Sequence, residues 1–207
     1  MDAKTAQAFR LAAGVLVTGS AIGVMASLIG PGGSTTAMVS SSLYTPAVWG
    51  ELAAGFLTVG SFSAVLVRQW PKIGWLGIAG LALVLLGGFA AAITQPFFNV
   101  FAVPWMAQVN PAAADAGPGS GFAAYVTAGG VVLAVGAIVF GVASWRAGVL
   151  GRWAGPAFGA LFIVGSVLVA VGANSFLGNL AGVAFYLGLG LMGAALWSSV
   201  GGRYEAS

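Results

Sequence analysis

Six apolar runs fill most of this 207-residue chain and constrain its fold more than any other feature of the sequence. They cover residues 11–30, 47–67, 73–94, 122–144, 154–173 and 179–200. A helix needs about 20 apolar residues to cross the ~30 Å hydrocarbon core of a bilayer, and each run has about that length. The runs therefore predict an all-α integral membrane protein, in which residues 1–207 form a single bundle of six transmembrane helices.

The chain also carries too few charges to cover a water-exposed surface. Charged residues make up 5% of the sequence, against roughly 25% in a soluble domain. Lipid can solvate such a surface, so we expect the lipid bilayer to be the chain's main partner. The 34 glycines, with abundant alanine and valine, are typical of high-GC bacterial proteins and suggest the bacterial cytoplasmic membrane.

The basic residues predict an orientation. If the N-terminus is cytoplasmic, the cytoplasmic pieces of a six-span chain are residues 1–10, 68–72, 145–153 and 201–207. These pieces contain all seven basic residues, which are Lys4, Arg10, Arg68, Lys72, Arg146, Arg152 and Arg203. Because basic residues concentrate in cytoplasmic loops, we expect both termini to be cytoplasmic.

Two segments of the chain resemble each other. One begins at Arg68 with RQWPKIGW and the other at Arg146 with RAGVLGRW, and each leads into an apolar span that ends in a short polar patch. This likeness suggests a parallel internal repeat, in which spans 2–3 match spans 4–5. The alternative is that low-complexity helices with similar ends look alike without a duplication.

The composition excludes several kinds of chemistry. Cysteine and histidine are both absent, which removes disulfides, thiolates, the usual haem ligand and the commonest zinc ligand. Zinc-protease, phosphate-loop and dinucleotide motifs are absent as well. The chain has only four carboxylates, namely Asp2, Glu51, Asp115 and Glu205. We therefore expect no enzymatic activity, no cofactor, no metal site and, despite a net charge of +3, no nucleic-acid partner.

One acid lies at the head of an apolar run. Glu51 is about four residues inside the second span and so lies close to the outer boundary. Four amides are expected at the same level, which gives a candidate polar outer site of Glu51, Gln95, Asn99, Asn174 and Asn179. A carboxylate among amides can bind a cation or exchange a proton. The alternative is that these residues cap helix ends at the wet interface.

Small residues and one long connection complete the expected architecture. The pairs Gly19/Gly23, Gly155/Gly159 and Gly178/Gly182 predict close packing of helices, inside the bundle or against a partner. Residues 95–121 are expected to form an outer loop, whose aromatic side chains lie in the interface, cover the bundle or dock a partner. Asp115 falls in the part of this loop that is rich in Gly, Ala and Pro, where we expect mobility.

Two functions remain open. The first is a non-catalytic accessory or scaffold subunit of a bacterial membrane complex, which binds other membrane-protein subunits or further copies of itself. The alternative is a small-solute or ion transporter or channel with an outward-facing polar entry site around Glu51. Spans 3 to 6 contain no charge, whereas a conducting pathway usually needs polar groups at depth. The sequence therefore favours the first function.

Overall fold

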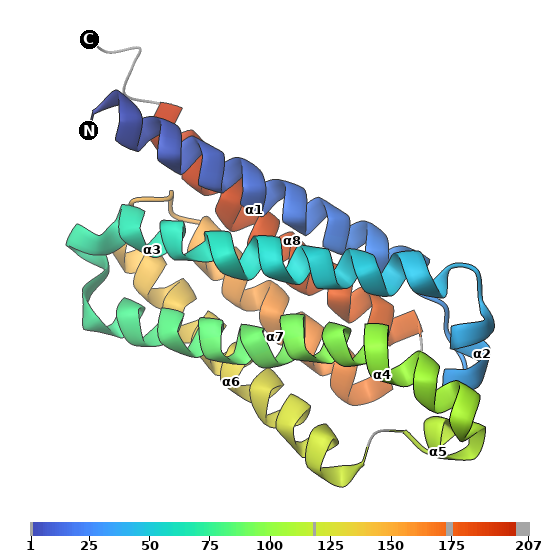
Figure 1. Ribbon diagram of the computed structural model, residues 1–207. Coiled ribbons are helices and arrows are strands. Elements are labelled where there is room, and N and C mark those ends of the chain that lie inside the picture. The colour runs from blue at the N-terminus through green and yellow to red at the C-terminus, as the bar shows by residue number, and fades with distance from the viewer. Residues whose placement is uncertain (1, 118, 173–175, 202–207) are drawn as a thin grey trace.

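The computed structural model describes residues 2–117, 119–172 and 176–201, and this part of the chain is all-helical, without strands (Figure 1). Its elements are α1 (Ala3–Ile29), α2 (Thr35–Ser40), α3 (Tyr44–Gly88), the π turn η1 (Phe89–Thr94), α4 (Gln95–Val109), α5 (Pro111–Asp115), α6 (Ser120–Ala147), α7 (Ala154–Gly172) and α8 (Phe176–Gly201). In this described part, five helical stretches are long and apolar enough to cross a membrane, namely 3–29, 44–109, 111–147, 154–171 and 176–200. The all-α architecture expected from the sequence is confirmed.

The longest helix, α3, folds back on itself. Gly74 has φ 66° and ψ 178°, and the two halves of α3 run in opposite directions from this turn (Figure 1). A positive φ of this kind is strained for residues with a Cβ, so the turn requires glycine. Pro71 lies just before it and lacks the N–H that a continuous helix would use. The predicted runs 47–67 and 73–94 therefore fall largely in the two arms of one hairpin.

The long helices form a closed ring of contacts. α1 packs on α3 and α8, α6 packs on α3 and α7, and α7 packs on α8. Gly19 of α1 lies against Leu57 in the first half of α3. In the second half, a Cβ at Gly80 would lie 2.6 Å from the backbone nitrogen of Phe140 in α6. Small residues therefore let the backbones approach closely, as helix association in lipid requires.

The glycine pairs identified in the sequence take part in contacts inside the chain. Gly155 lies against the backbone of Gly141 in α6. Gly182 of α8 lies against Ser27 of α1. Together with Gly19, these residues bring neighbouring helices of the same bundle together, which is one of the two roles that their spacing predicts.

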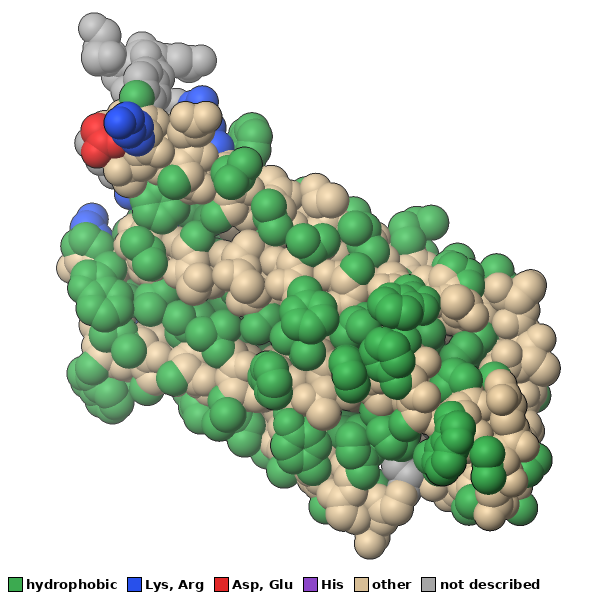
Figure 2. All heavy atoms as spheres, in the orientation of Figure 1, with side chains coloured by type: hydrophobic (Ala, Val, Ile, Leu, Met, Phe, Trp, Pro, Cys, Tyr) green, Lys and Arg blue, Asp and Glu red, His purple; other side chains and the backbone are tan. Residues whose placement is uncertain are grey.

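One end of the bundle carries the basic residues. α1 begins there, α3 turns there, and the connection between α6 and α7 lies there (Figure 1). Figure 2 shows one face of the molecule, with charged side chains gathered at this end and hydrophobic ones over the rest. The basic residues of the described chain all belong to these segments: Lys4, Arg10, Arg68, Lys72, Arg146 and Arg152. Arg203 lies outside the described residues. We call this end the basic end and the opposite one, with α2 and α5, the α2 end.

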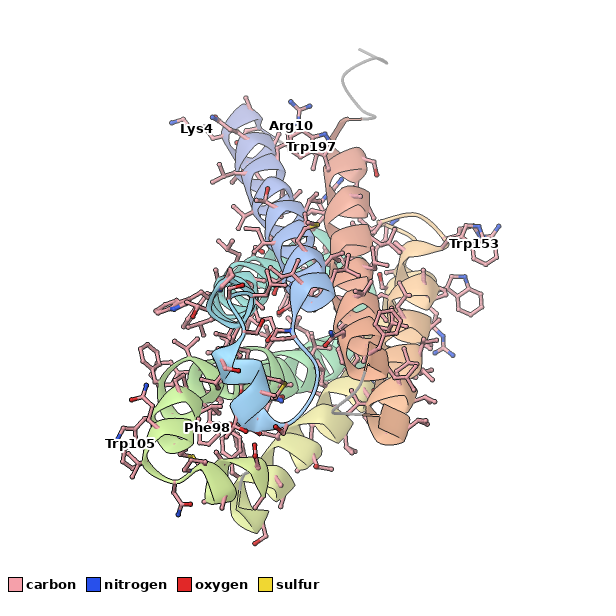
Figure 3. The ribbon with its side chains drawn as sticks, turned by 90° about the vertical axis from the view of Figure 1, so that its right-hand side faces the viewer. Lys4, Arg10, Phe98, Trp105, Trp153 and Trp197 are labelled. Atoms are coloured by element: carbon pink, nitrogen blue, oxygen red, sulfur yellow. The ribbon has the colours of Figure 1, made fainter. Side chains whose placement is uncertain are left out.

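Residues 95–121 differ from the outer loop that the sequence predicts. The second half of α3 continues through η1 into α4, which ends only at Val109. Pro96 has no N–H to donate to the carbonyl of Ala92, which favours the wider turn, and the N–H of Gln95 bonds to the carbonyl of Ala90. Figure 3 looks at the α2 end and shows Phe98 and Trp105 on this extended helix. Pro96 therefore follows a widened turn and does not end the helix, and Pro104 lies within α4.

The internal repeat stays a prediction. Both segments start at the basic end and run toward the α2 end, as a parallel repeat requires (Figure 1). Their turns differ, however. The first reverses the chain at Gly74 within α3, whereas the second uses residues 148–153, with Gly148 at φ 65° and Gly151 at φ 85°.

Candidate functional site

Two cavities meet near the α2 end. The outer cavity has a volume of about 360 Å³ and lies among α2, α3, α4 and the start of α8. The inner cavity has a volume of about 400 Å³ and extends into the bundle. Glu51, Gln95, Phe122 and Gly178 line both cavities. Each volume falls within the range of about 300–1,000 Å³ that small-molecule sites occupy.

Four of the five residues of the polar outer site line the outer cavity: Glu51, Gln95, Asn99 and Asn179. They come from α3, α4 and α8, which all have an end at the α2 end of the bundle. Asn174 lies outside the described residues. The sequence predicted that these residues lie at the same depth in the membrane, and the fold brings four of them together around one cavity.

Two of the amide residues also form hydrogen bonds that join the segments around the outer cavity. The side-chain nitrogen of Asn179 donates a hydrogen bond of 2.9 Å to the carbonyl of Gly30, the C-cap residue that follows α1. The backbone carbonyl of Asn99 accepts a hydrogen bond of 2.7 Å from the hydroxyl of Tyr44. Asn179 therefore has the helix-capping role that was the alternative for these amides, because its side-chain nitrogen bonds to a carbonyl at the end of a helix.

Glu51 supplies the charge of the site. It is half-buried, and no described residue gives its carboxylate a hydrogen bond or an ion pair. The hydroxyl of Tyr186 donates to the backbone carbonyl of Glu51, at 3.3 Å, and so does not serve the carboxylate. The described basic residues all lie at the basic end. Because removing an uncompensated charge from water is costly, this carboxylate favours a cation beside it.

Ser27 adds a hydroxyl to the inner cavity. This residue of α1 is 2% exposed and lines the cavity, and its Oγ has no hydrogen-bond partner among the described residues. An unsatisfied buried hydroxyl costs about 1–3 kcal/mol, and native proteins rarely leave one. Its Oγ lies against Gly182 of α8, at the edge of the cavity. Ser27 was not predicted as a site residue, although Gly19, Gly23 and Ser27 recur every four residues on one face of α1.

Aromatic side chains separate the inner cavity from the basic end. Phe62 and Phe162 line the cavity, and each packs on the buried ring of Phe158, at centroid distances of 5.3 and 4.6 Å. Phe140 lies 5.4 Å from Phe62 and is also fully buried. We call these four residues the phenylalanine cluster. Their rings fill the interior of the bundle on the basic side of the cavity.

Two sets of polar contacts join helices at the basic end. The hydroxyl of Ser144 in α6 donates to the side-chain oxygen of Gln69 in α3, at 2.8 Å, and both residues are fully buried. The guanidinium of Arg68 donates to the hydroxyl of Ser199 at 3.2 Å and to its carbonyl at 2.9 Å. α3 is thereby tied to α6 and α8 where the phenylalanine cluster ends. These contacts were not predicted from the sequence.

Asp115 fastens the short helices at the α2 end. Its carboxylate accepts a hydrogen bond of 2.8 Å from the N–H of Thr36 and one of 2.9 Å from the hydroxyl of the same residue. The Thr36 N–H, followed by the Thr36 hydroxyl, holds the pKa of Asp115 below its usual value. The residue that we expected in a mobile loop is therefore bound to the first turn of α2.

The arrangement suits reversible binding of a small molecule. The cavities offer one carboxylate, several amides and hydroxyls, and a largely apolar wall. No family model, curated protein or solved structure matches the chain. The geometry of the cavities is therefore the basis on which a function can be assigned.

Proposed function

We propose that this chain is a transporter for small organic cations, which enter at the α2 end and bind beside Glu51. In this proposal the two arms of α3 are separate spans, so the bundle has six. The basic end and both termini face the bacterial cytoplasm, in keeping with the concentration of basic residues in cytoplasmic loops. The reversal at Gly74 and the common location of the six described basic residues support this topology.

The observation that carries the proposal is the position of Glu51. Its carboxylate, without a partner among the described residues, lies where a polar outer cavity meets a mostly apolar inner one. A ligand with a positive charge and a hydrophobic body satisfies both parts. The rings of Phe62, Phe162 and Phe185 line the inner cavity and offer aromatic surfaces, which attract cations at short range.

The contrast between the two ends supports transport over simple binding. A carrier needs a form in which its site is reached from one side while the other side is closed. Here the cavities lie toward the α2 end, and the phenylalanine cluster fills the interior toward the basic end. We assign this form to the state that receives solute from the outer side.

Binding of tetraphenylphosphonium to purified protein in detergent tests the proposal. We expect wild type to bind this hydrophobic cation and to ignore uncharged triphenylphosphine oxide. Glu51→Gln keeps the side-chain size and removes the charge, so it should weaken binding at least about tenfold, or about 1.4 kcal/mol. Asp2→Asn is the matched control, because it removes one negative charge at the basic end and Asp2 lines neither cavity. Equal affinity of wild type and Glu51→Gln would exclude the proposed site.

The accessory-subunit function is the second proposal, and one observation favours it. The buried polar side chains toward the basic end, such as Thr58, Gln69 and Ser144, already have hydrogen-bond partners within the bundle. Among the described residues, they leave no polar path for a solute through the phenylalanine cluster. Native mass spectrometry distinguishes the two functions. A stable complex with another membrane protein, unchanged by Glu51→Gln, supports the accessory subunit.

A further inference from the structure

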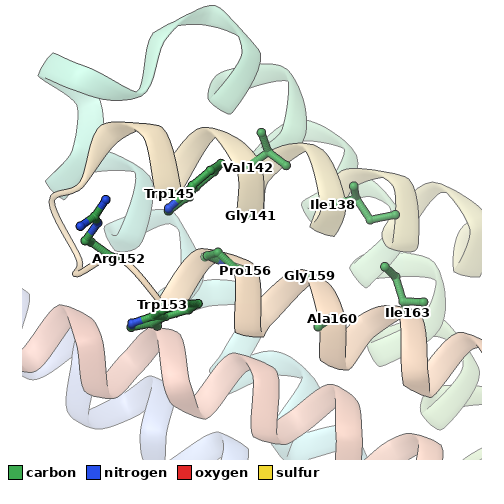
Figure 4. Close-up of a pocket in the computed structure, with 11 residues that line it drawn as sticks. Ile138, Gly141, Val142, Trp145, Arg152, Trp153, Pro156, Gly159, Ala160 and Ile163 are labelled. Atoms are coloured by element: carbon green, nitrogen blue, oxygen red, sulfur yellow. The ribbon is translucent and has the colours of Figure 1, made fainter.

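A third hollow lies on the outer surface of the bundle, between α6 and α7. It has a volume of about 670 Å³ and is separate from the two cavities at Glu51. Its floor is the contact between two glycines, since a Cβ at Gly141 would lie 2.6 Å from the carbonyl oxygen of Gly155. The walls are apolar and include Ile138, Val142 and Ile163, as Figure 4 shows. We call this hollow the α6–α7 groove.

The groove has a cationic and aromatic head. Arg152 lies in the connection between the two helices, and Trp145 and Trp153 lie beside it at the same end of the groove (Figure 4). Trp153 is 82% exposed and Trp145 is 50% exposed. No described residue gives Arg152 a hydrogen bond or an ion pair, so its guanidinium is available to a ligand.

The length of the groove matches one leaflet of a membrane. From Trp153 at the basic end to Ile163, the wall extends along about ten residues of helix, or about 15 Å. Half of the ~30 Å hydrocarbon core is also about 15 Å. Tryptophan is enriched at the boundary between headgroups and hydrocarbon, and basic pockets between helices on the cytoplasmic side bind anionic lipid headgroups. Arg152 is therefore at the level of the lipid headgroups, and the apolar walls of the groove are at the level of the acyl chains.

We infer that the α6–α7 groove binds one anionic phospholipid, with its phosphate at Arg152 between the two tryptophans and an acyl chain along the apolar walls. The glycine floor lets α6 and α7 approach each other closely, because any side chain there would meet the opposite backbone, and the space for the acyl chain lies outside this contact, between the apolar walls. This inference rests on the topology proposed above and is independent of the ligand at Glu51.

Lipid titration of delipidated protein in detergent tests the inference. Native mass spectrometry counts bound lipids while phosphatidylglycerol is compared with phosphatidylcholine of the same acyl chains. We expect wild type to prefer the anionic lipid by about fivefold, the effect of one basic side chain near a charged lipid. Arg152→Gln should abolish this preference. Arg146→Gln removes a charge from the same end but outside the groove, and should keep the preference.

Two further arms separate the lipid from other occupants. Ala160→Phe places a ring in the groove from an exposed position and should reduce binding of both lipids. Soluble glycerol 3-phosphate, which offers the charge without acyl chains, should leave the melting temperature unchanged. The inference is overturned if Arg152→Gln retains the wild-type preference, or if Ala160→Phe dissociates a dimer and leaves lipid binding unchanged, because a second copy of the chain would then occupy the groove.

Discussion

The polar groups inside the bundle differ between its two ends. At the basic end, Gln69 and Ser144 are buried and hydrogen-bonded to each other, and Arg68 is bound to the end of α8. At the α2 end, Glu51 and Ser27 border cavities, and neither side-chain group has a hydrogen-bond partner among the described residues. Buried polar groups that have hydrogen-bond partners stabilise a bundle, whereas those without partners cost free energy. Inside the bundle, therefore, the polar groups near the basic end have partners within the protein, whereas two of those at the cavities do not.

The largest expected effect on stability comes from removing one ring of the phenylalanine cluster, on the basic side of the inner cavity. Phe158→Ala should lower the free energy of unfolding by about 3–5 kcal/mol, because it empties the centre of the phenylalanine cluster. Unfolding in mixed detergent micelles measures this loss. Glu51→Gln is the matched substitution at the α2 end and should leave stability unchanged or raise it. A loss of similar size in both variants would remove the distinction between the ends.

A smaller effect is expected for the polar contact at the basic end. Ser144→Ala leaves the side-chain oxygen of Gln69 without its buried donor and should cost about 1 kcal/mol. Ser63→Ala is the control, because Ser63 is exposed and bonds only to its own helix. A double-mutant cycle with Gln69→Leu isolates the pair. A coupling energy near zero would show that this contact does not hold the basic end together.

The smallest effect is a loosening of the α2 end in acid. The pKa of Asp115 is lowered from its usual 3.8 by the Thr36 N–H and hydroxyl, so the contact is strongest when the carboxylate is charged. Its stabilisation is therefore present above pH 3.8 and is lost as the pH falls through the lowered pKa. Hydrogen exchange should show a protected Thr36 amide at neutral pH in wild type and a faster one in Asp115→Asn. Equal protection in both would mean that the carboxylate does not hold α2.

Several features were predictable because they depend on composition and chain order. Apolar runs of about 20 residues predicted the long helices, and the clustering of basic residues anticipated their common end. Glu51, Gln95, Asn99 and Asn179 were predicted at one level because all four flank helix ends. What could not be predicted is rotation about each helix axis. That rotation decides that Ser27 borders a cavity and that Gln69 meets Ser144.

The extension of α3 through η1 into α4 was missed for a different reason. Pro96 and Pro104 are normally taken as the end of a helix. Here the π turn absorbs the missing N–H of Pro96, and Gln95 bonds to the carbonyl five residues back. Sequence patterns based on a period of 3.6 residues do not detect such a turn.

The π turn also sets the direction in which the side chains of α4 point about the helix axis. One additional residue in a helical turn rotates the subsequent side chains by about 100° relative to an uninterrupted α-helix, since each residue of an α-helix accounts for about that angle. Gln95 and Asn99 face the outer cavity in this rotated phase. Deleting a single alanine from the FAAAIT segment would return the helix to the regular phase and direct both amides away from Glu51, with no side chain of the site itself changed.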